Sequence, residues 1–266
     1  MKTGYAMQTL REFNDTHDII LAGHRGDSTN APENTMSAFE SAIAVGADMI
    51  ETDIYLTADK QIVLHHNSTI MTPNGKQPIG ALTLSQLKEI DIGSSFAPKF
   101  SGERVPEFSE FLALIKGRAY LNLEIKPQNG INPTEYIDLI VNKIEEAGVG
   151  DQVMLASYFY DMLAEIHVRY PNYPTAGIYI PHIPLMPHEL LDKFGISAFI
   201  CSLSSLNKEI SNDIKACNLV LAAYSIDNEK HFAKAMRYGV KALGSNCPAK
   251  IAELLRNRAS QSPASR

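Results

Sequence analysis

Three carboxylates, Glu51, Asp53 and Glu124, lie in two apolar segments with the composition of β-strands, residues 49–56 and 120–125. Glu51 and Asp53 are two residues apart, so in a strand both side chains point to the same face. Carboxylates that share one face repel each other and need a cation, and a site made only of oxygen ligands selects Mg²⁺ or Ca²⁺ over zinc. An isolated Glu-x-Asp pair is more often a solvated strand face, but the apolar neighbours of this pair disfavour simple exposure. The pattern therefore indicates a candidate site for one divalent cation.

Two histidines bracket the Glu-x-Asp pair, because His24 follows the first apolar segment and His65 ends an extended one. An ordinary pKa near 6.5 suits histidine to general acid–base catalysis. Cleavage of a phosphodiester requires that a nucleophile lose a proton, that the departing alkoxide gain one, and that charge on the phosphoryl oxygens be offset. The histidines are suited to the proton transfers, and the cation, Arg25 and Lys126 to the charge. A lone histidine after a strand is more often structural, and a bracketing pair favours function.

Composition limits the partners that this chain of 266 residues can take. A net charge of −6 and a pI near 5.8 leave no broad basic field, which argues against a nucleic-acid partner. A small anionic substrate remains compatible, because one metal ion and one arginine reverse the sign of the charge locally. A hydrophobic fraction of 45% is sufficient for a large buried core.

The elements that must position these residues alternate regularly along the chain. Apolar segments begin near residues 19, 49, 120, 152, 175, 198, 219 and 242, and each is followed by a segment with helical periodicity. Alternating strands and helices predict a parallel sheet, and eight such units in about 250 residues predict an α/β fold of the closed (β/α)8 TIM-barrel type. An open doubly wound sheet is the competing arrangement, but no glycine-rich dinucleotide motif follows the first strand. Proline and glycine interrupt residues 67–106, which we interpret as an insertion over one barrel face.

The chain ends carry weaker patterns. Residues 1–18 are polar and predict a loose N-terminal arm, the barrel is expected over 19–258, and residues 259–266 have the composition of a flexible tail. The N-terminus has no apolar signal-peptide core, and no window reaches the roughly 18 apolar residues of a membrane span. We therefore expect a cytoplasmic protein without a membrane span. The three cysteines lack metal-ligand spacing and are expected to be free thiols.

Over about residues 19–256 the chain resembles the glycerophosphodiester phosphodiesterase family. The matching segments are residues 24–26, 32–35, 46–53, 63–65, 102–106, 123–127, 224–227, 238–240 and 245–248. The resemblance implies a (β/α)8 barrel with a small insertion after the second histidine. It also implies release of an alcohol from a glycerophosphodiester, which leaves sn-glycerol 3-phosphate. The mechanism it suggests has the glycerol 2-hydroxyl attack phosphorus to give a cyclic phosphate, which water then opens.

By the same resemblance, Glu51, Asp53 and Glu124 match the positions that bind one Ca²⁺ or Mg²⁺. His24 and His65 match the acid–base pair of the family. The small-molecule substrate is therefore expected to meet both histidines beside the cation.

Arg25 and Lys126 match family positions near the phosphate, and Tyr224 is expected to wall the substrate pocket. The sequence departs from the family pattern in two places. His66 stands where the family usually has aspartate directly after the second histidine, and an imidazole does not reproduce the charge of a carboxylate. The late strand carries Tyr-Ser-Ile-Asp, ending at Asp227, where the family often has Trp-Thr-Val-Asn. These departures affect the expected metal affinity, pH optimum and substrate preference.

Two alternatives remain open at the level of the sequence. One is a related phosphodiesterase barrel that acts on lipids, although no basic amphipathic stretch for a membrane surface is evident. The other is a barrel that binds a phosphodiester with reduced or lost catalysis, for which the change at His66 is the only support.

Overall fold

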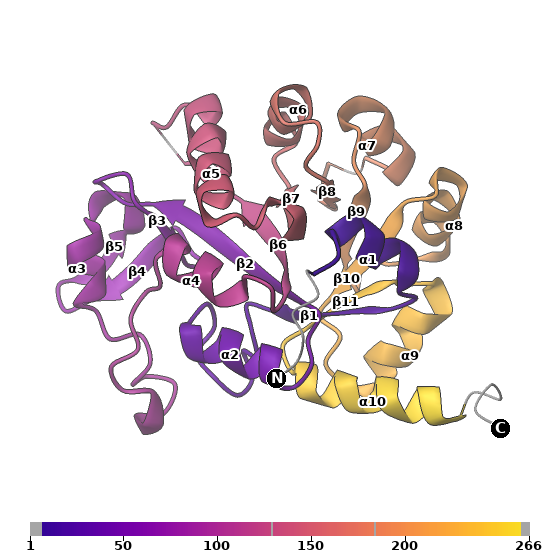
Figure 1. The fold of residues 1–266 in the computed structure, drawn as a ribbon, viewed down its shortest axis with the longest axis horizontal. Helices are drawn as coiled ribbons and strands as arrows, with labels where there is room; N and C mark the ends of the chain where they lie inside the picture. Colours follow the sequence, from indigo (N-terminus) through magenta and orange to yellow (C-terminus); the bar gives the residue numbers. More distant parts are fainter. Residues whose placement is uncertain (1–6, 129, 184, 262–266) are drawn as a thin grey trace.

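A computed structural model describes residues 7–128, 130–183 and 185–261. Within them, eight parallel strands form a closed ring, in the order β1-β2-β6-β7-β8-β9-β10-β11 and back to β1 (Figure 1). Their bounds are β1 Ile20–His24, β2 Met49–Leu56, β6 Tyr120–Ile125, β7 Val153–Ser157, β8 Thr175–Ile178, β9 Ala198–Ser202, β10 Val220–Tyr224 and β11 Ala242–Ser245. The predicted (β/α)8 TIM barrel is confirmed, and β2 and β6 have the bounds that the apolar segments indicated.

Helices surround the ring of strands (Figure 1). They are α2 Met36–Ala44, α4 Phe108–Ile115, α5 Pro133–Ala147, α6 Tyr160–Arg169, α7 Pro187–Phe194, α8 Lys208–Cys217, α9 Glu229–Tyr238 and α10 Pro248–Gln261. Side-chain caps begin several of them, as where the Asn132 oxygen accepts the backbone N–H groups of Thr134 and Glu135 at the start of α5. Their apolar stripes and the outward faces of the strands form the main core.

The interior of the barrel is lined by a mixture of small and large apolar side chains. Alternate residues of each strand point inward, and the inner cluster contains five alanines beside larger residues such as Ile20, Met49, Tyr120 and Met154. Space remains at the carboxyl ends of the strands, where the candidate site residues lie.

A short helix, α1 (Leu10–Thr16), precedes the first strand and packs on the amino-terminal end of the barrel. Leu10 and Phe13 are buried, and the Phe13 ring lies 4.4 Å from that of Tyr120 between ring centroids. Thr9 and Glu12 form a capping box that satisfies the first backbone N–H groups of this helix. The prediction of a loose arm is therefore wrong for residues 10–16, because this segment forms a short helix with two buried apolar side chains. Residues 1–6 lie outside the described part of the chain.

The segment between β2 and α4 builds a small layer at one side of the barrel (Figure 1). β3 (Ile62–Leu64) extends the sheet by pairing antiparallel with β2. The later elements are β4 Thr69–Thr72, β5 Gly75–Pro78, η1 Ile79–Ala81, α3 Leu84–Lys88 and η2 Pro98–Phe100. They cover an apolar cluster of their own. The sequence predicted an interrupted insertion here but not the β4–β5 hairpin.

At the other end of the chain, α10 extends through residues 259–261, which the sequence had assigned to the flexible tail. Residues 262–266 are outside the described part, so the rest of that prediction falls there. Among the described residues, no helix combines the length and the apolar character that crossing a bilayer requires.

Candidate active site

Glu51, Asp53 and Glu124 converge at the carboxyl ends of two adjacent strands. Glu51 and Asp53 lie on β2, and the parallel register with β6 places Glu124 beside Asp53. One oxygen of each carboxylate lies within 4.8 Å of the other two. Glu51 is 8% exposed and Asp53 only 1%. The strand alternation therefore brings three acidic side chains together in a poorly solvated place.

The electrostatics of this cluster are incomplete without a cation. Burial, followed by the charge of Asp53, raises the pKa of Glu51 and of Glu124 above the ordinary value. The Oδ1 atom of Asn122, the residue paired with Glu51 on β6, is buried and accepts no hydrogen bond among the described residues. Clustered carboxylate and amide oxygen atoms are the donor set that Mg²⁺ or Ca²⁺ takes. The residues present therefore fit a hard divalent cation.

Two basic side chains flank the carboxylates. Lys126 Nζ lies 2.5 Å from Asp53 Oδ1 and 3.6 Å from Glu124 Oε1, and it donates a hydrogen bond of 3.0 Å to the His66 carbonyl oxygen. Arg25 Nε lies 3.7 Å from Asp53 Oδ2. Burial disfavours the charge on Lys126, but the carboxylates of Asp53 and Glu124 outweigh it and raise the pKa of the ammonium group. The side chains of Lys126 and Arg25 are thus both held in their charged form at the edge of the acidic cluster.

The turn after β1 explains the His-Arg-Gly motif. Arg25 has φ +59°, a left-handed conformation that is uncommon for a residue with a side chain. Its backbone N–H stabilises that conformation by donating to both the carbonyl oxygen and the carboxylate Oε2 of Glu51, each at 3.0 Å. Gly26, with φ +85°, has no room for a side chain, because a Cβ would lie 2.6 Å from the backbone of Ala38. The turn therefore orients His24 and Arg25 toward β2.

His24 is fixed on both sides of its ring. Its Nδ1 lies 2.7 Å from Oδ1 of Asn246, its Nε2 lies 3.9 Å from Oε2 of Glu51, and the ring stacks on Tyr224 with centroids 5.4 Å apart. Burial, followed by the charge of Arg25, lowers the pKa of His24. A neutral imidazole that donates from Nδ1 has its lone pair on Nε2, on the side of the acidic cluster.

His65 is held differently. It follows β3, its backbone N–H donates to the Asp53 carbonyl oxygen at 3.0 Å, and its Nδ1 lies 2.8 Å from the carbonyl oxygen and 3.2 Å from the amide nitrogen of Asn67. Burial lowers its pKa. Among the described residues, His66 and Asn67 line the cavity at the carboxyl ends of the strands, whereas His65 is not part of its wall. The structure therefore places His65 beside the cavity rather than in it.

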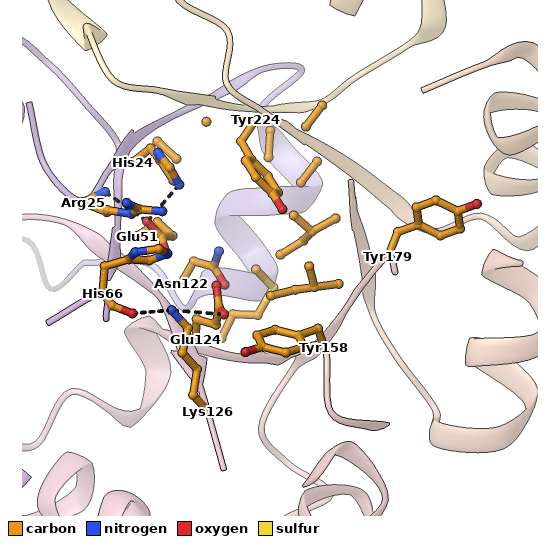
Figure 2. A pocket seen from close by; sticks show the side chains of 18 of the residues that line it. His24, Arg25, Glu51, His66, Asn122, Glu124, Lys126, Tyr158, Tyr179 and Tyr224 are labelled. Carbon is orange, nitrogen blue, oxygen red and sulfur yellow. Dashed lines mark hydrogen bonds and ion pairs between the residues drawn. The ribbon is translucent and has the colours of Figure 1, made fainter. Parts of the chain in front are cut away.

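A cavity of about 510 Å³ opens over these groups at the carboxyl ends of the strands. Of the expected site residues, it is lined by His24, Arg25, Glu51, Glu124, Lys126 and Tyr224, while Asp53 lies beneath it. Figure 2 shows Tyr224 and Tyr158 on opposite sides of this space, with Asn122 between them and close to Glu124. Apolar side chains form one part of the wall, among them Met49, Met154, Ile178 and Ile200. One polar side and one apolar side suit a phosphodiester with an organic alcohol.

The sequence did not single out Asn122, Asn246, Tyr55 or Tyr158 as site residues, although all contact the cavity or His24. A signal existed for Asn122, which is two residues before Glu124 on β6 and so shares its face. Asn246 lies in the segment 245–248 that matches the family, although no role was assigned to it. No local pattern marks Tyr55 or Tyr158, because their place depends on contacts between distant segments.

The comparisons with known proteins agree with this geometry. The model of the Glycerophosphoryl diester phosphodiesterase family matches residues 24–250. The Bacillus subtilis protein YhdW is 30% identical over 236 residues, which cover 86% of this chain and 95% of that protein. A glycerophosphodiester phosphodiesterase from Caldanaerobacter subterraneus is 28% identical over 241 residues, or 89% and 98% of the two chains.

Among solved structures, a phosphodiesterase from Oleispira antarctica in complex with the product sn-glycerol 3-phosphate is similar to this chain. It superposes with a TM-score of 0.82 at 26% identity, over 89% of this chain and 96% of the other. The family match covers nearly the whole barrel, and the expected resemblance is confirmed. The chain belongs to the glycerophosphoryl diester phosphodiesterase family and is an enzyme of that family.

Proposed function

We propose that the protein hydrolyses glycerophosphodiesters to sn-glycerol 3-phosphate and an alcohol, with a divalent cation as its cofactor. The observation that carries the proposal is the cluster of Glu51, Asp53 and Glu124, with oxygen atoms within 4.8 Å of one another, below the imidazole of His24. The product bound to the Oleispira antarctica relative supports the choice of substrate.

Glu51, Asp53 and Glu124 would hold the cation, and their oxygen ligands favour Mg²⁺ or Ca²⁺. When bound, a divalent cation supplies Lewis acidity, which polarises a phosphoryl oxygen and lowers the pKa of a coordinated hydroxyl. Arg25 and Lys126 contribute fixed positive charge at the same place, where it offsets the charge on the phosphoryl oxygens.

His24 acts as the base in this proposal. Its Nε2 carries the lone pair and accepts the proton of the glycerol 2-hydroxyl while that oxygen forms a bond to phosphorus. His65, beside the cavity, gives a proton to the departing alkoxide as the bond between phosphorus and the alcohol breaks. Water then opens the cyclic phosphate by the reverse proton movements, which leaves glycerol 3-phosphate. Tyr224 stacks on His24 and walls the glycerol side.

The direct test incubates the purified protein with glycerophosphocholine, glycerophosphoethanolamine or glycerophosphoglycerol, and measures glycerol 3-phosphate. Release is expected with Mg²⁺ or Ca²⁺ and is expected to stop with EDTA. Glu51→Gln, which keeps the shape of the side chain but removes its charge, serves as the matched variant and should require far more cation. If none of the three substrates is cleaved under any cation, the proposal is wrong. Binding of these diesters without cleavage would instead support a barrel that has lost catalysis.

A further inference from the structure

The turn that follows β11 is tied to the segment that follows β10 by the carboxylate of Asp227. Asp227 Oδ1 accepts hydrogen bonds from the backbone N–H of Asn246 at 2.7 Å and from Ser245 Oγ at 3.1 Å. Asp227 Oδ2 accepts from the side-chain Nδ2 of Asn246 at 2.9 Å. Both oxygens of one carboxylate are therefore used to hold a single residue, Asn246, by its backbone and its side chain.

This arrangement determines which way the Asn246 amide points. A carboxylate accepts hydrogen bonds and does not donate them when ionised, so it must face the NH₂ group of Asn246. The carbonyl oxygen, Oδ1, is then directed to the opposite side. There it lies 2.7 Å from Nδ1 of His24 and accepts a bond of 3.2 Å from Ser28 Oγ.

The orientation of the amide in turn determines the tautomer of His24. A carbonyl oxygen at 2.7 Å from Nδ1 accepts a hydrogen bond, so Nδ1 must carry the proton and Nε2 the lone pair. Were the amide reversed, its NH₂ group would face Nδ1 and favour the opposite tautomer. That tautomer has a proton on Nε2 and cannot act as a base toward the cavity.

We infer that Asp227 and Asn246 are positioning residues for His24, in a chain in which Asp227 orients the Asn246 amide and the amide selects the Nδ1–H tautomer of His24. The inference rests on the proposed role of His24 as base. Neither residue touches the reacting atoms, because Asp227 acts only through Asn246, and Asn246 contacts the ring nitrogen that faces away from the acidic cluster. Asp227 follows β10, Asn246 follows β11 and His24 is the last residue of β1, and these three strands are consecutive neighbours in the barrel.

This series of hydrogen bonds makes a distinctive prediction, because the side chains of Asp227 and Asn246 can be exchanged with each other. In Asp227→Asn, one carbonyl oxygen must serve three donors and the Asn246 amide is free to reverse. In Asn246→Asp, two carboxylates face each other and repel. In the double variant, the amide at position 227 donates to the carboxylate at position 246, which still accepts from His24 and Ser28. Only the side-chain hydrogen bond between positions 227 and 246 then has its donor and acceptor exchanged, and the other hydrogen bonds of the network keep their directions.

The experiment compares kcat for both single variants and the double variant at saturating glycerophosphocholine and Mg²⁺. We expect each single variant to lose about 10–100-fold in kcat with little change in KM, and the double variant to recover to within several-fold of the parent. Cys247→Ala is the matched control, since its thiol lies in the same turn and donates to the Asp227 carbonyl oxygen without joining the chain to His24. It should keep kcat within about twofold.

A second readout does not depend on turnover. Long-range ¹H–¹⁵N spectra of protein labelled with ¹⁵N-histidine report the tautomer of each ring, and His24→Gln identifies the His24 signals. The parent and the double variant should show His24 as the Nδ1–H tautomer, and Asp227→Asn should show a mixture. An unchanged Nδ1–H tautomer in Asp227→Asn, or a double variant no more active than the single ones, would overturn the inference. If the parent cleaved no diester, the spectra would still decide the positioning chain separately from the proposed function.

Discussion

The two walls of the cavity hold their functional side chains by different interactions. The wall formed by β1, β10 and β11 holds His24 through hydrogen bonds that are complete within the protein. The wall formed by β2, β6 and the following insertion holds three carboxylates, among which Glu51 and Glu124 have pKa values raised by burial and then by the charge of Asp53. It also places His65 on a loop beside the cavity. The first wall is preorganised, whereas in the proposed function the second is completed by a divalent cation. Proton acceptance and charge stabilisation are therefore separable, and substitutions should distinguish them.

The largest effect is expected on the preorganised wall. His24→Gln removes the base but preserves a polar side chain near Asn246, so we expect kcat to fall by about 10²–10⁴-fold. The melting temperature and the affinity for Mg²⁺ should change little, because His24 is not among the proposed ligands. Steady-state kinetics and a calorimetric titration with Mg²⁺ measure both. Retention of the parent's kcat would show that His24 is not the base.

His65→Gln sharpens the comparison, because the proposal gives His65 the proton that the leaving alcohol needs. We expect a loss of about 10²-fold or more with glycerophosphocholine, but a much smaller loss with a p-nitrophenyl diester, whose leaving group departs without a proton. His24→Gln should lose activity on both substrates. Equal losses for the two variants on both substrates would contradict the division of roles between the walls.

The carboxylates on the wall of β2 and β6 should make the folding stability of the protein depend on pH and on Mg²⁺. The pKa values of Glu51 and Glu124 are raised in the folded cation-free protein, so this protein binds more protons than the unfolded chain above the ordinary value of about 4.5. The stability contributed by these two groups is therefore present at low pH and lost as the pH rises through the raised values. Mg²⁺ should offset that loss, by about 2.7 kcal/mol at a concentration 100 times its Kd.

Scanning calorimetry of matched samples with EDTA or Mg²⁺, from pH 5 to 9, measures this effect. The increase in Tm given by Mg²⁺ is expected to grow with pH and to shrink in Glu124→Gln, which removes one proposed ligand. An increment that is independent of pH, or that is unchanged in the variant, would count against a cation site at these carboxylates.

The smallest effect is expected at His66. Its carbonyl oxygen accepts from Lys126, and this contact involves the backbone, so His66→Asp should preserve it. The new carboxylate would add negative charge to the wall of β2 and β6. We expect Mg²⁺ to bind several-fold more tightly and kcat to stay within about tenfold. A calorimetric titration tests this, and an unchanged affinity would show that position 66 does not contribute to the charge of the site.

Much of the architecture could be predicted from the sequence, because the local periodicity of apolar residues indicates strands and helices. The bounds of β2 and β6 followed from apolar runs, and Glu51, Asp53 and Glu124 could be grouped because side chains two apart on neighbouring parallel strands share a face. Family resemblance supplied their proposed roles.

What the sequence did not reveal depends on contacts between distant segments. Helix α1 was mistaken for a loose arm, since Leu10 and Phe13 are its buried side chains and two apolar residues make no periodic pattern. The partnership of His24 with Asn246 joins residues 222 positions apart. Asn246 lies in the segment 245–248 that matches the family, but that match assigned it no role, and its hydrogen bond to His24 is evident only from the structure.

The central claim is that this cation-dependent site cleaves glycerophosphodiesters, and ³¹P NMR of glycerophosphocholine incubated with the protein tests it most directly. With Mg²⁺, the diester resonance should decline while that of glycerol 3-phosphate grows, and with EDTA the diester should persist. A diester resonance that is unchanged in the presence of both Mg²⁺ and Ca²⁺, or equal cleavage with EDTA, would contradict the claim.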